Sequence, residues 1–472
     1  MWPDWELLAT LPARLDEAVD DALLAGLLKY APGGGLAHAP FALTPSPIDP
    51  ALHAAMQALT APFNRLAHAV ARTPEFLHEV LAPAARVDPF TARLLSMARG
   101  GRGQRSLYLG VTRSDYFVHQ AGPHDAPALR QVELNTISAS YPGLSQRVAR
   151  LHRQLLLGTP LAARLVPNDP LPALADGFAQ AFARYGHPQA RVLMVVQPGE
   201  TNVFDQRLLE EALRERGLET RRRTLESIAL GGRLRDGHLV VDGELMAIVY
   251  FRAAYGPEDF QSEGDFHARA LIEAASAIAV PDLYTQLAGA KKVQQALSDP
   301  AVLARFLPAR EAARVAGCFA GQYDLEQPLA TPAGPRPAWQ VAREQPHAFV
   351  LKPQREGGGH NAFDAELVQR LDALPPAERP AYILMERIRP VRHSAYLVRE
   401  RAARRVEAVS EVGRFGVYLA EGGRMRLNRD AGYLVRSKAH DTQEGGVSAG
   451  FGFLDSLLLS EEAPDGAAPD PP

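Results

Sequence analysis

Several features are scarce in this 472-residue chain, and each absence excludes a class of protein. It has one cysteine, Cys318, so an intrachain disulfide and a cysteine-rich zinc site are both excluded. Its formal net charge of -3 excludes a strongly basic nucleic-acid-binding protein. No apolar run approaches the roughly 18 residues that a membrane-spanning helix needs. The start MWPDWELLAT has no basic region leading into an apolar one, so we expect no signal peptide.

Three widespread nucleotide and metal motifs are also missing, namely GxxxxGK[ST], GxGxxG and HExxH. The histidines show no paired zinc spacing, and Cys318 is expected to be a small buried residue. What is present is 46% hydrophobic residues, in a chain long enough to bury a large core in two or more domains. These observations predict a cytoplasmic globular protein without a membrane or nucleic-acid partner.

The order of expected helices and strands divides the chain. Helical segments at 1–80 surround a loop at 31–50 where Pro and Gly prevent regular structure, and strands at 105–118 and 128–138 follow. The strand QARVLMVVQPG, the helix DQRLLEEALRERG and the hairpin HLVVDGELMAIVYFR then predict a compact α/β domain. In its helix, Asp205 is expected at the N-cap and Gly217 at the end.

The remaining segments complete an α/β (α+β) pattern. We predict a helix at 291–306 and strands in AFVLKPQ, AYILMERI and VEAVSEVGRFGVYLA. The tail EEAPDGAAPDPP is acidic and rich in proline, so we expect it to be disordered.

The stretch LKPQREGGGHN at 351–361 places charges directly against three glycines. Glycines let backbone N–H groups approach a ligand closely, as peptide amides do when they hold phosphate. Lys352 would add a positive charge, and Glu356 an oxygen ligand for a magnesium ion that accompanies the phosphates. A flexible hairpin tip explains the glycines equally well.

The stretch VELNTISAS at 132–140 places Glu133 and Asn135 two residues apart on a strand, so both oxygens project from one face. A carboxylate and an amide oxygen suit Mg²⁺. A solvated strand ending in a Ser-rich turn is the alternative.

Basic residues also stand in apolar contexts. Each one singly is best explained as a surface charge, but several at the ends of apolar strands suit a site that gathers carboxylate or phosphate. They are Arg113, Arg252, Lys291, Lys292, Arg436 and Lys438. Together with the glycine run and the acidic residues, they predict a nucleotide site assembled from distant segments.

The sequence motifs of this chain resemble those of a known family, the eukaryotic-type glutathione synthetases. The motifs that carry the resemblance run in a similar order from about residue 38 to 455; they are FTARLL, LGVTRSDY, VELNTISAS, NVFDQR, VYFRAAY, TQLAGAKKVQQAL, FVLKPQREGGGHN, YILMERI, SEVGRFGVY and VRSKA…EGGVSAG. The resemblance implies an ATP-grasp fold with an inserted α/β substrate domain and a lid subdomain, and a homodimer. It places the N-terminal part of the main domain at 1–188, the substrate domain at 189–290, and the nucleotide-binding part at 291–460 with a lid at about 324–406, before the tail at 461–472.

The resemblance also implies an activity. ATP would phosphorylate the cysteinyl carboxylate of γ-glutamylcysteine, and the amine of glycine would displace phosphate from the acyl phosphate. Two Mg²⁺ ions would neutralise the phosphates.

Site residues follow from the resemblance by motif. The Mg²⁺ ligands would be Glu133, Asn135 and Glu356. The nucleotide contacts would be Glu133, Lys291, Lys352, Pro353, Gln354, Arg355, Glu356, Gly357, Gly358, Gly359, His360, Asn361, Phe363, Met385, Glu386, Arg387, Ile388, Glu411, Lys438 and Glu444. The peptide and acceptor contacts would be Arg113, Ile137, Ser138, Ala139, Ser140, Glu200, Thr201, Asn202, Gln206, Arg252, Ala253, Ala254, Tyr255, Arg436, Val447 and Ser448. Arg113 and Arg436 would act in catalysis.

Two alternatives stay open. Ser448 stands where the family usually has alanine in the acceptor segment, so a homoglutathione-type ligase that uses β-alanine or serine remains an alternative to a glycine-using enzyme. A non-catalytic ATP-binding relative is the other alternative.

Overall fold

The computed structural model describes residues 5–31, 33–100, 105–122, 124–354, 360–442, 446–447 and 450–460. Its largest sheet has seven strands in the order β18-β3-β21-β20-β19-β5-β6, and β18 also pairs with β19. These strands are β3 (Phe41–Ala42), β5 (Leu107–His119), β6 (Ala128–Asn135), β18 (His393–Arg399), β19 (Ala402–Glu421), β20 (Arg424–Ala439) and β21 (Phe453–Asp455).

Two smaller sheets accompany it. One has the path β8-β7-β11-β10-β9 with β12 beside β11, and the other has the order β13-β17-β16. Their strands are β7 (Arg191–Val195), β8 (Thr220–Arg223), β9 (Gly232–Arg235), β10 (His238–Val241), β11 (Glu244–Phe251), β12 (Ile278–Val280), β13 (Gln322–Tyr323), β16 (Phe349–Pro353) and β17 (Tyr382–Glu386). Three two-stranded pairs are β1 (Leu28–Tyr30) with β2 (Leu36–His38), β14 (Pro328–Leu329) with β15 (Arg336–Pro337), and β4 (Ser46–Ile48) with β22 (Leu457–Leu459).

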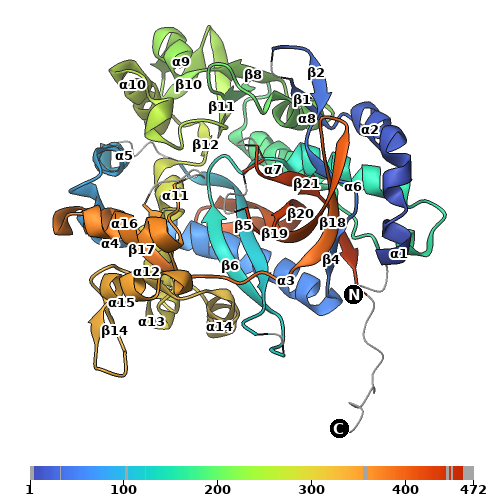
Figure 1. The fold of residues 1–472 in the computed structure, drawn as a ribbon. Coiled ribbons are helices and arrows are strands. Elements are labelled where there is room, and N and C mark those ends of the chain that lie inside the picture. Colours follow the sequence, from blue (N-terminus) through green and yellow to red (C-terminus); the bar gives the residue numbers. More distant parts are fainter. Residues whose placement is uncertain are drawn as a thin grey trace.

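Helices surround these sheets. They are α1 (Trp5–Leu8), α2 (Leu15–Leu24), α3 (Pro50–Ala71), α4 (Pro74–Ala85), α5 (Pro89–Gly100), α6 (Pro142–Leu155), α7 (Pro170–Tyr185), α8 (Val203–Arg214), α9 (Leu225–Gly231), α10 (Glu263–Ala274), α11 (Leu283–Ala288), α12 (Lys291–Leu297), α13 (Pro300–Leu303), α14 (Ala309–Cys318), α15 (Ala338–Glu344) and α16 (Asp364–Ala373). In Figure 1 the β7–β12 sheet lies at the top with α9 and α10, the central sheet lies below it, and α12 to α16 lie at the lower left.

The central sheet buries a different core on each face. Along β19, Phe415 and Val417 belong to the core that includes Phe178 of α7, whereas Val412 belongs to the core that includes Phe63 of α3. This alternation follows the two-residue period of a strand. The face that α7 covers at one end carries charged residues further along, and these form the site described below.

The opposite face holds a buried polar network. Ser46 and Ser437 both donate to Asp455 Oδ2, over 2.6 and 2.5 Å, and Ser410 lies 2.7 Å from each serine. The His393 ring nitrogen Nε2 lies 2.8 Å from Ser410. Burial raises the pKa of Asp455 to about 7. The network joins five strands directly behind Glu411, Arg436 and Lys438.

Several sequence predictions are confirmed. The strands predicted at 105–118 and 128–138 form β5 and β6, and Cys318 is buried. The Asp-Gly hairpin joins β10 to β11, with Val241 opposite Glu244 and positive φ at Asp242 and Gly243. No helix among the described residues is long and apolar enough to cross a membrane.

Three predictions were wrong. The segment 31–50 contains β2, β3 and β4, because short strands there pair with β1, β18, β21 and β22. The helix expected at 291–306 breaks after Leu297, since Asp299 caps a new helix that begins at Pro300. Asp205 is not an N-cap; Asn202 holds that position of α8, and Asp205 lies in the first turn.

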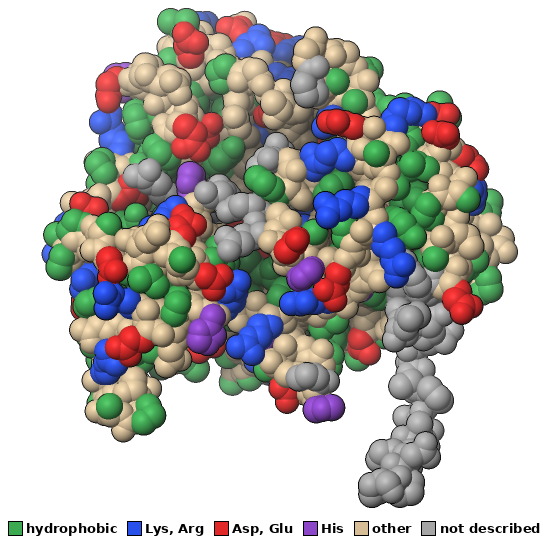
Figure 2. Space-filling model, in the orientation of Figure 1, with side chains coloured by type: hydrophobic (Ala, Val, Ile, Leu, Met, Phe, Trp, Pro, Cys, Tyr) green, Lys and Arg blue, Asp and Glu red, His purple; other side chains and the backbone are tan. Residues whose placement is uncertain are grey.

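The surface carries charges of both signs. Over the face in Figure 2, acidic and basic side chains are interspersed. This distribution agrees with the small net charge of -3.

Candidate active site

Charged side chains from four adjacent strands share one face of the central sheet. Arg113 of β5 lies opposite Asn135 of β6, and Glu133 is two residues away on the same strand. Glu411 of β19 lies opposite Arg436 of β20, and β19 also pairs with β5. Because side chains two apart point to one face, the structure brings together five residues predicted from distant segments.

The two arginines bind acidic partners. Arg436 Nη2 donates to Glu411 Oε1 over 2.6 Å and to Asp115 Oδ2 over 3.1 Å. Arg113 donates to both carboxylate oxygens of Asp115, from Nε over 2.7 Å and from Nη2 over 2.8 Å. Burial raises the pKa of Glu411, and the acidic neighbours raise the pKa of Arg436 against the opposing effect of its own burial.

Two lysines approach Glu133 from outside this sheet. Lys291, the first residue of α12, places Nζ 3.9 Å from Glu133 Oε2, and Lys352 Nζ of β16 donates to the Val132 carbonyl over 3.2 Å. Burial alone would raise the pKa of Glu133, but these lysines with Arg436 and Arg113 lower it to about 2. Glu133 is therefore ionised at every pH of physiological interest.

The environment of Lys352 favours its uncharged form, whereas that of Glu133 favours the charged form. Burial lowers the pKa of its ammonium group to about 8, although Glu133 pulls it upward. Lys438 lies two residues beyond Arg436 on β20, on the same face of that strand.

The Glu133–Asn135 pair suits a hard cation. Asn135 Nδ2 donates to Asp115 Oδ2 and Glu133 Oε1, over 3.1 and 3.3 Å, so its amide carbonyl oxygen faces away from both carboxylates. An ionised carboxylate and an amide oxygen are ligands that Mg²⁺ accepts. Among the described residues no group of three His, Cys, Asp or Glu side chains could hold a metal. A magnesium site here depends on oxygens from ATP, water or Glu356, which lies outside the described residues.

The predicted peptide-contact segment continues from β6 toward the second sheet. Arg113 Nη1 donates to the Ser140 carbonyl over 3.2 Å, and Arg252 Nη2 donates to Ser140 Oγ over 2.9 Å. Arg252 Nη1 pairs with Asp205 over 3.2 Å, and both side chains are fully buried. Ser140 therefore connects the two predicted arginines.

The backbone of this region is strained. Ser138, Tyr141 and Ala254 have φ values of 49°, 76° and 70°. Such values cost a non-glycine residue about 1–3 kcal/mol and cluster at functional sites. Ala254 is held by Gln286 Nε2, which donates to its carbonyl over 2.9 Å.

The other predicted peptide contacts lie close by. Glu200 accepts from the Asn202 backbone N–H over 2.7 Å and from Gln206 Nε2 over 2.6 Å, whereas Thr201 is exposed. The Tyr255 hydroxyl accepts from Gln197 over 3.0 Å. Ile137, Ala139, Ala253 and Val447 are buried.

Some predicted nucleotide contacts lie on or next to β16 and β17, whereas Glu133, Glu411 and Lys438 lie on the central sheet. Gln354 Oε1 accepts from the Lys292 backbone N–H over 2.7 Å, which joins the end of β16 to α12. Met385 is buried, and Glu386 accepts from the Tyr323 hydroxyl over 2.7 Å. The guanidinium carbon of Arg387 lies 5.6 Å from the centroid of the Phe363 ring.

Described residues on the two sides of the glycine run pair with each other. Leu351 and Ala362 exchange backbone hydrogen bonds of 3.1 and 2.9 Å, so the chain leaves β16 and returns beside it. His360 is exposed and Asn361 is half-buried; Pro353 ends β16, and Ile388 follows β17. The predicted residues that lie outside the described residues are Arg355, Glu356, Gly357, Gly358, Gly359, Glu444 and Ser448.

Three polar residues that hold these segments were not among the predicted site residues. Asp115 joins the two arginines, and its position two residues after Arg113 on a strand was an available signal. Gln294 accepts from the Leu134 backbone N–H over 2.7 Å and so fixes β6 to α12. Asp205 accepts from the backbone N–H groups of Tyr141 and Gly143, over 2.9 and 2.8 Å.

Asp205 therefore holds both the start of α6 and Arg252. We expect Asp205→Asn to lower the free energy of unfolding by about 2–4 kcal/mol, because buried donors and a buried cation lose a charged partner. Urea unfolding checks this. As the control, Asp176→Asn removes a half-exposed carboxylate bound to Arg216 and Arg429, and should cost at most about 1 kcal/mol. Equal losses in both variants would contradict the assignment.

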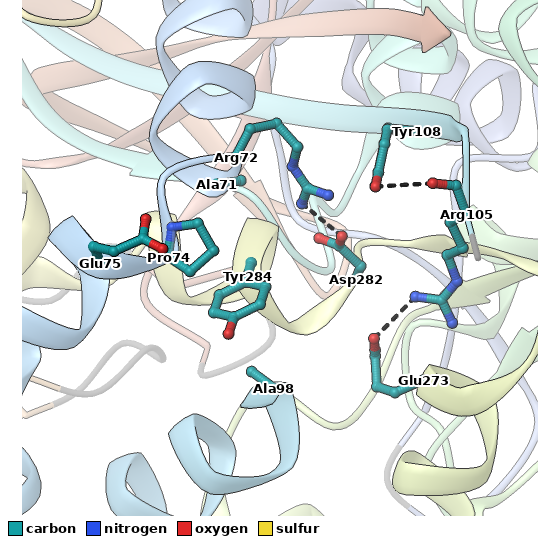
Figure 3. A pocket seen from close by; sticks show the side chains of 10 residues that line it. All are labelled: Ala71, Arg72, Pro74, Glu75, Ala98, Arg105, Tyr108, Glu273, Asp282 and Tyr284. Carbon is teal, nitrogen blue, oxygen red and sulfur yellow. Dashed lines mark hydrogen bonds and ion pairs between the residues drawn. The ribbon is translucent and has the colours of Figure 1, made fainter. Parts of the chain in front are cut away.

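A separate cavity of about 380 Å³ is lined by residues on or next to α3, α4, α5, β5, α10 and α11. Figure 3 shows two ion pairs in it, Arg72 with Asp282 and Arg105 with Glu273, over 2.5 and 2.9 Å. Its lining contains no predicted site residue; it is formed by Ala71, Arg72, Pro74, Glu75, Ala98, Arg105, Tyr108, Glu273, Asp282 and Tyr284. These ion pairs connect the end of α3 to the start of α11, and the segment before β5 to α10. They therefore hold neighbouring elements together.

Comparisons with known proteins agree with one another. A sequence model for the ATP-binding domain of eukaryotic glutathione synthase matches residues 17–459. Glutathione synthetase of Bos taurus is 41% identical over 93% of this chain and 95% of that protein, and that of Homo sapiens is 40% identical over 97% and 99%. The chloroplastic glutathione synthetase of Solanum lycopersicum is 40% identical over 91% of this chain and 79% of that protein.

The fold has a solved counterpart. A glutathione synthetase-like effector from Globodera pallida, in its apo form, superposes with a TM-score of 0.76 over 95% of this chain and 96% of that one. Its sequence identity is 21%, so this likeness shows the fold alone. From the family match and the relatives at about 40% identity, we conclude that this chain belongs to the eukaryotic glutathione synthase family.

Proposed function

We propose that this chain joins γ-glutamylcysteine to glycine with ATP, forming glutathione, ADP and phosphate through an acyl phosphate. The observation that carries the proposal is the shared sheet face, where two arginines, three carboxylates and the nearby lysines gather from six separate segments. A site with this many cations suits a substrate carboxylate and transferring phosphate, since positioning and charge neutralisation dominate phosphoryl transfer.

The residues have distinct tasks in this proposal. Arg113 and Arg252, joined through Ser140, hold the dipeptide. Arg436 faces the reacting carboxylate and neutralises charge on the acyl phosphate. The predicted peptide and acceptor contacts around them exclude water, which would otherwise hydrolyse that intermediate.

The nucleotide-binding part of the site contains the two lysines. Lys291 and Lys352 bind phosphate, and β17 with Phe363 receives the adenine. Glu133 and Asn135, with Glu356, would hold Mg²⁺, which would supply charge neutralisation for the phosphates.

The direct test is product formation. Purified protein with ATP, Mg²⁺, γ-glutamylcysteine and glycine is expected to release phosphate and yield the tripeptide in equal amounts. A competition among glycine, β-alanine and serine is expected to favour glycine, and preference for another acceptor would establish the homoglutathione-type alternative. Nucleotide binding without any product would contradict the proposed activity and favour the non-catalytic alternative.

Nucleotide affinity should depend on the charge of Lys352. The protonated ammonium is the form that binds phosphate, and its pKa is about 8, so ADP affinity is expected to fall by about tenfold per pH unit above that pH. Calorimetry with ADP at pH 7 and pH 9 measures this. Lys352→Arg should bind ADP without this decline, because a guanidinium stays protonated. A decline of the same size in both proteins would refute the role of Lys352.

We further propose the domain division stated above, a homodimer and a cytoplasmic location. The β7–β12 sheet supports a distinct substrate domain at 189–290. The exposed side chains of Leu24, Tyr30 and Leu36 on α2, β1 and β2 support a dimer, which light scattering would test.

A further inference from the structure

Asp115 lies at the centre of the site without being one of its predicted members. Its side chain is fully buried. Its Oδ1 accepts from Arg113 Nε, and its Oδ2 accepts from Arg113, Asn135 and Arg436 over 2.8, 3.1 and 3.1 Å. One carboxylate thus binds a residue on each of three strands.

These contacts orient groups that the reaction needs. Arg113 makes two hydrogen bonds to Asp115, and these fix the plane of its guanidinium group. Arg436 is held between Asp115 and Glu411, so its direction is set by two partners. The amide of Asn135 donates to Asp115 and Glu133, which leaves its carbonyl oxygen as the uncommitted end.

The neighbouring strand leaves room for this arrangement. Gly413 of β19 lies opposite Asp115. A Cβ atom at Gly413 would overlap Asp115 Oδ1 and would lie 2.8 Å from Arg113 Cδ. Gly413 does not have a positive φ, so its lack of a side chain serves space and not backbone conformation.

We propose that Asp115 is the positioning residue of this site and that Gly413 keeps its place open. Asp115 sets the geometry of Arg113, Arg436 and Asn135 without touching substrate. This role rests on the proposed ligase function.

The test uses two variants that disturb the arrangement in different ways. Asp115→Asn keeps the shape of the side chain but removes the charge that both arginines share. Gly413→Ala keeps every polar group and displaces Asp115 and Arg113. Both are expected to lower kcat by about 100-fold, as misplacement of catalytic groups by about 1 Å does, and to change KM for ATP by less than about threefold.

The control is Gly317→Ala in α14, where an added Cβ meets no atom within 4 Å; it should keep wild-type kcat. Calorimetry of γ-glutamylcysteine without ATP or metal gives a readout besides activity, and both site variants should bind the dipeptide at least about tenfold more weakly. A merely structural role would instead lower the melting temperature and leave kcat per folded molecule unchanged.

The outcomes distinguish the proposed ligase activity from the role of Asp115. Wild-type protein without product would overturn the proposed function. Active wild type with Asp115→Asn inside about threefold of its kcat would overturn the role of Asp115 alone. Should Asp115→Asn not fold, Gly413→Ala decides, and wild-type kcat in that variant overturns the inference.

Discussion

Replacing Glu133 by glutamine is expected to lower turnover by about 100-fold or more. Glutamine keeps the size of the side chain but removes its charge. Because the pKa of Glu133 is about 2, the wild-type carboxylate is ionised throughout any assay range, so the defect should be equally large from pH 6 to pH 9. The variant should also need more Mg²⁺ for half-maximal rate, since an ionised ligand is lost.

A second readout follows from the coupling between Glu133 and Lys352. Glu133 raises the pKa of Lys352, which burial lowers. Without that carboxylate the pKa of Lys352 should fall below 8, so ADP affinity should begin to decline at a lower pH than in the wild type. Calorimetry with ADP over a pH series measures this shift without relying on turnover.

The matched control is Glu79→Gln, which neutralises an exposed glutamate on α4. It should leave both turnover and the pH dependence of ADP binding unchanged. Turnover of Glu133→Gln within about threefold of the control would contradict the assignment of Glu133 as a metal ligand.

Local sequence patterns predicted much of this site because they concern neighbours along one strand. The two-residue period placed Glu133 and Asn135 on one face, and β6 shows both on the same sheet face as Arg113 and Asp115, their partners on β5. The Asp-Gly turn predicted the β10–β11 hairpin for the same reason, since turn geometry is local. Local patterns predicted the α/β (α+β) class and the resemblance supplied the ATP-grasp fold; the family match and the fold of the effector agree with both.

Contacts between distant segments could not be predicted in this way. Asp205 looks like a helix cap in the sequence, but its carboxylate binds the start of α6 more than sixty residues earlier. The strands β3 and β4 have no local signal, because they form by pairing with strands from the C-terminal part of the chain. Asp115 acquires its importance only when β19 and β20 bring Gly413 and Arg436 beside it.

Replacing Arg436 is expected to impair both activity and stability. Arg436→Lys should lower kcat by about 100-fold or more, because an ammonium group cannot reproduce the planar contacts with Asp115 and Glu411. Arg436→Met should be equally inactive and should also lower the free energy of unfolding by about 3–5 kcal/mol, because two buried carboxylates lose a partner. The control is Arg426→Met, which removes an exposed arginine paired with Glu421 on the same strand pair and should cost at most about 1 kcal/mol.

The destabilisation by Arg436→Met should depend on pH in a definite direction. Burial already raises the pKa of Glu411, and Arg436 opposes that rise, so removing the arginine raises this pKa further. A carboxyl group with a raised pKa binds more protons in the folded than in the unfolded state, so stability falls as pH increases above the unfolded value of about 4.3. The variant should therefore lie closest to the wild type near pH 5 and furthest from it near pH 8. Urea unfolding at both pH values measures the difference, and a loss that is the same at both, or larger at pH 5, would show that Glu411 is not the group left uncompensated.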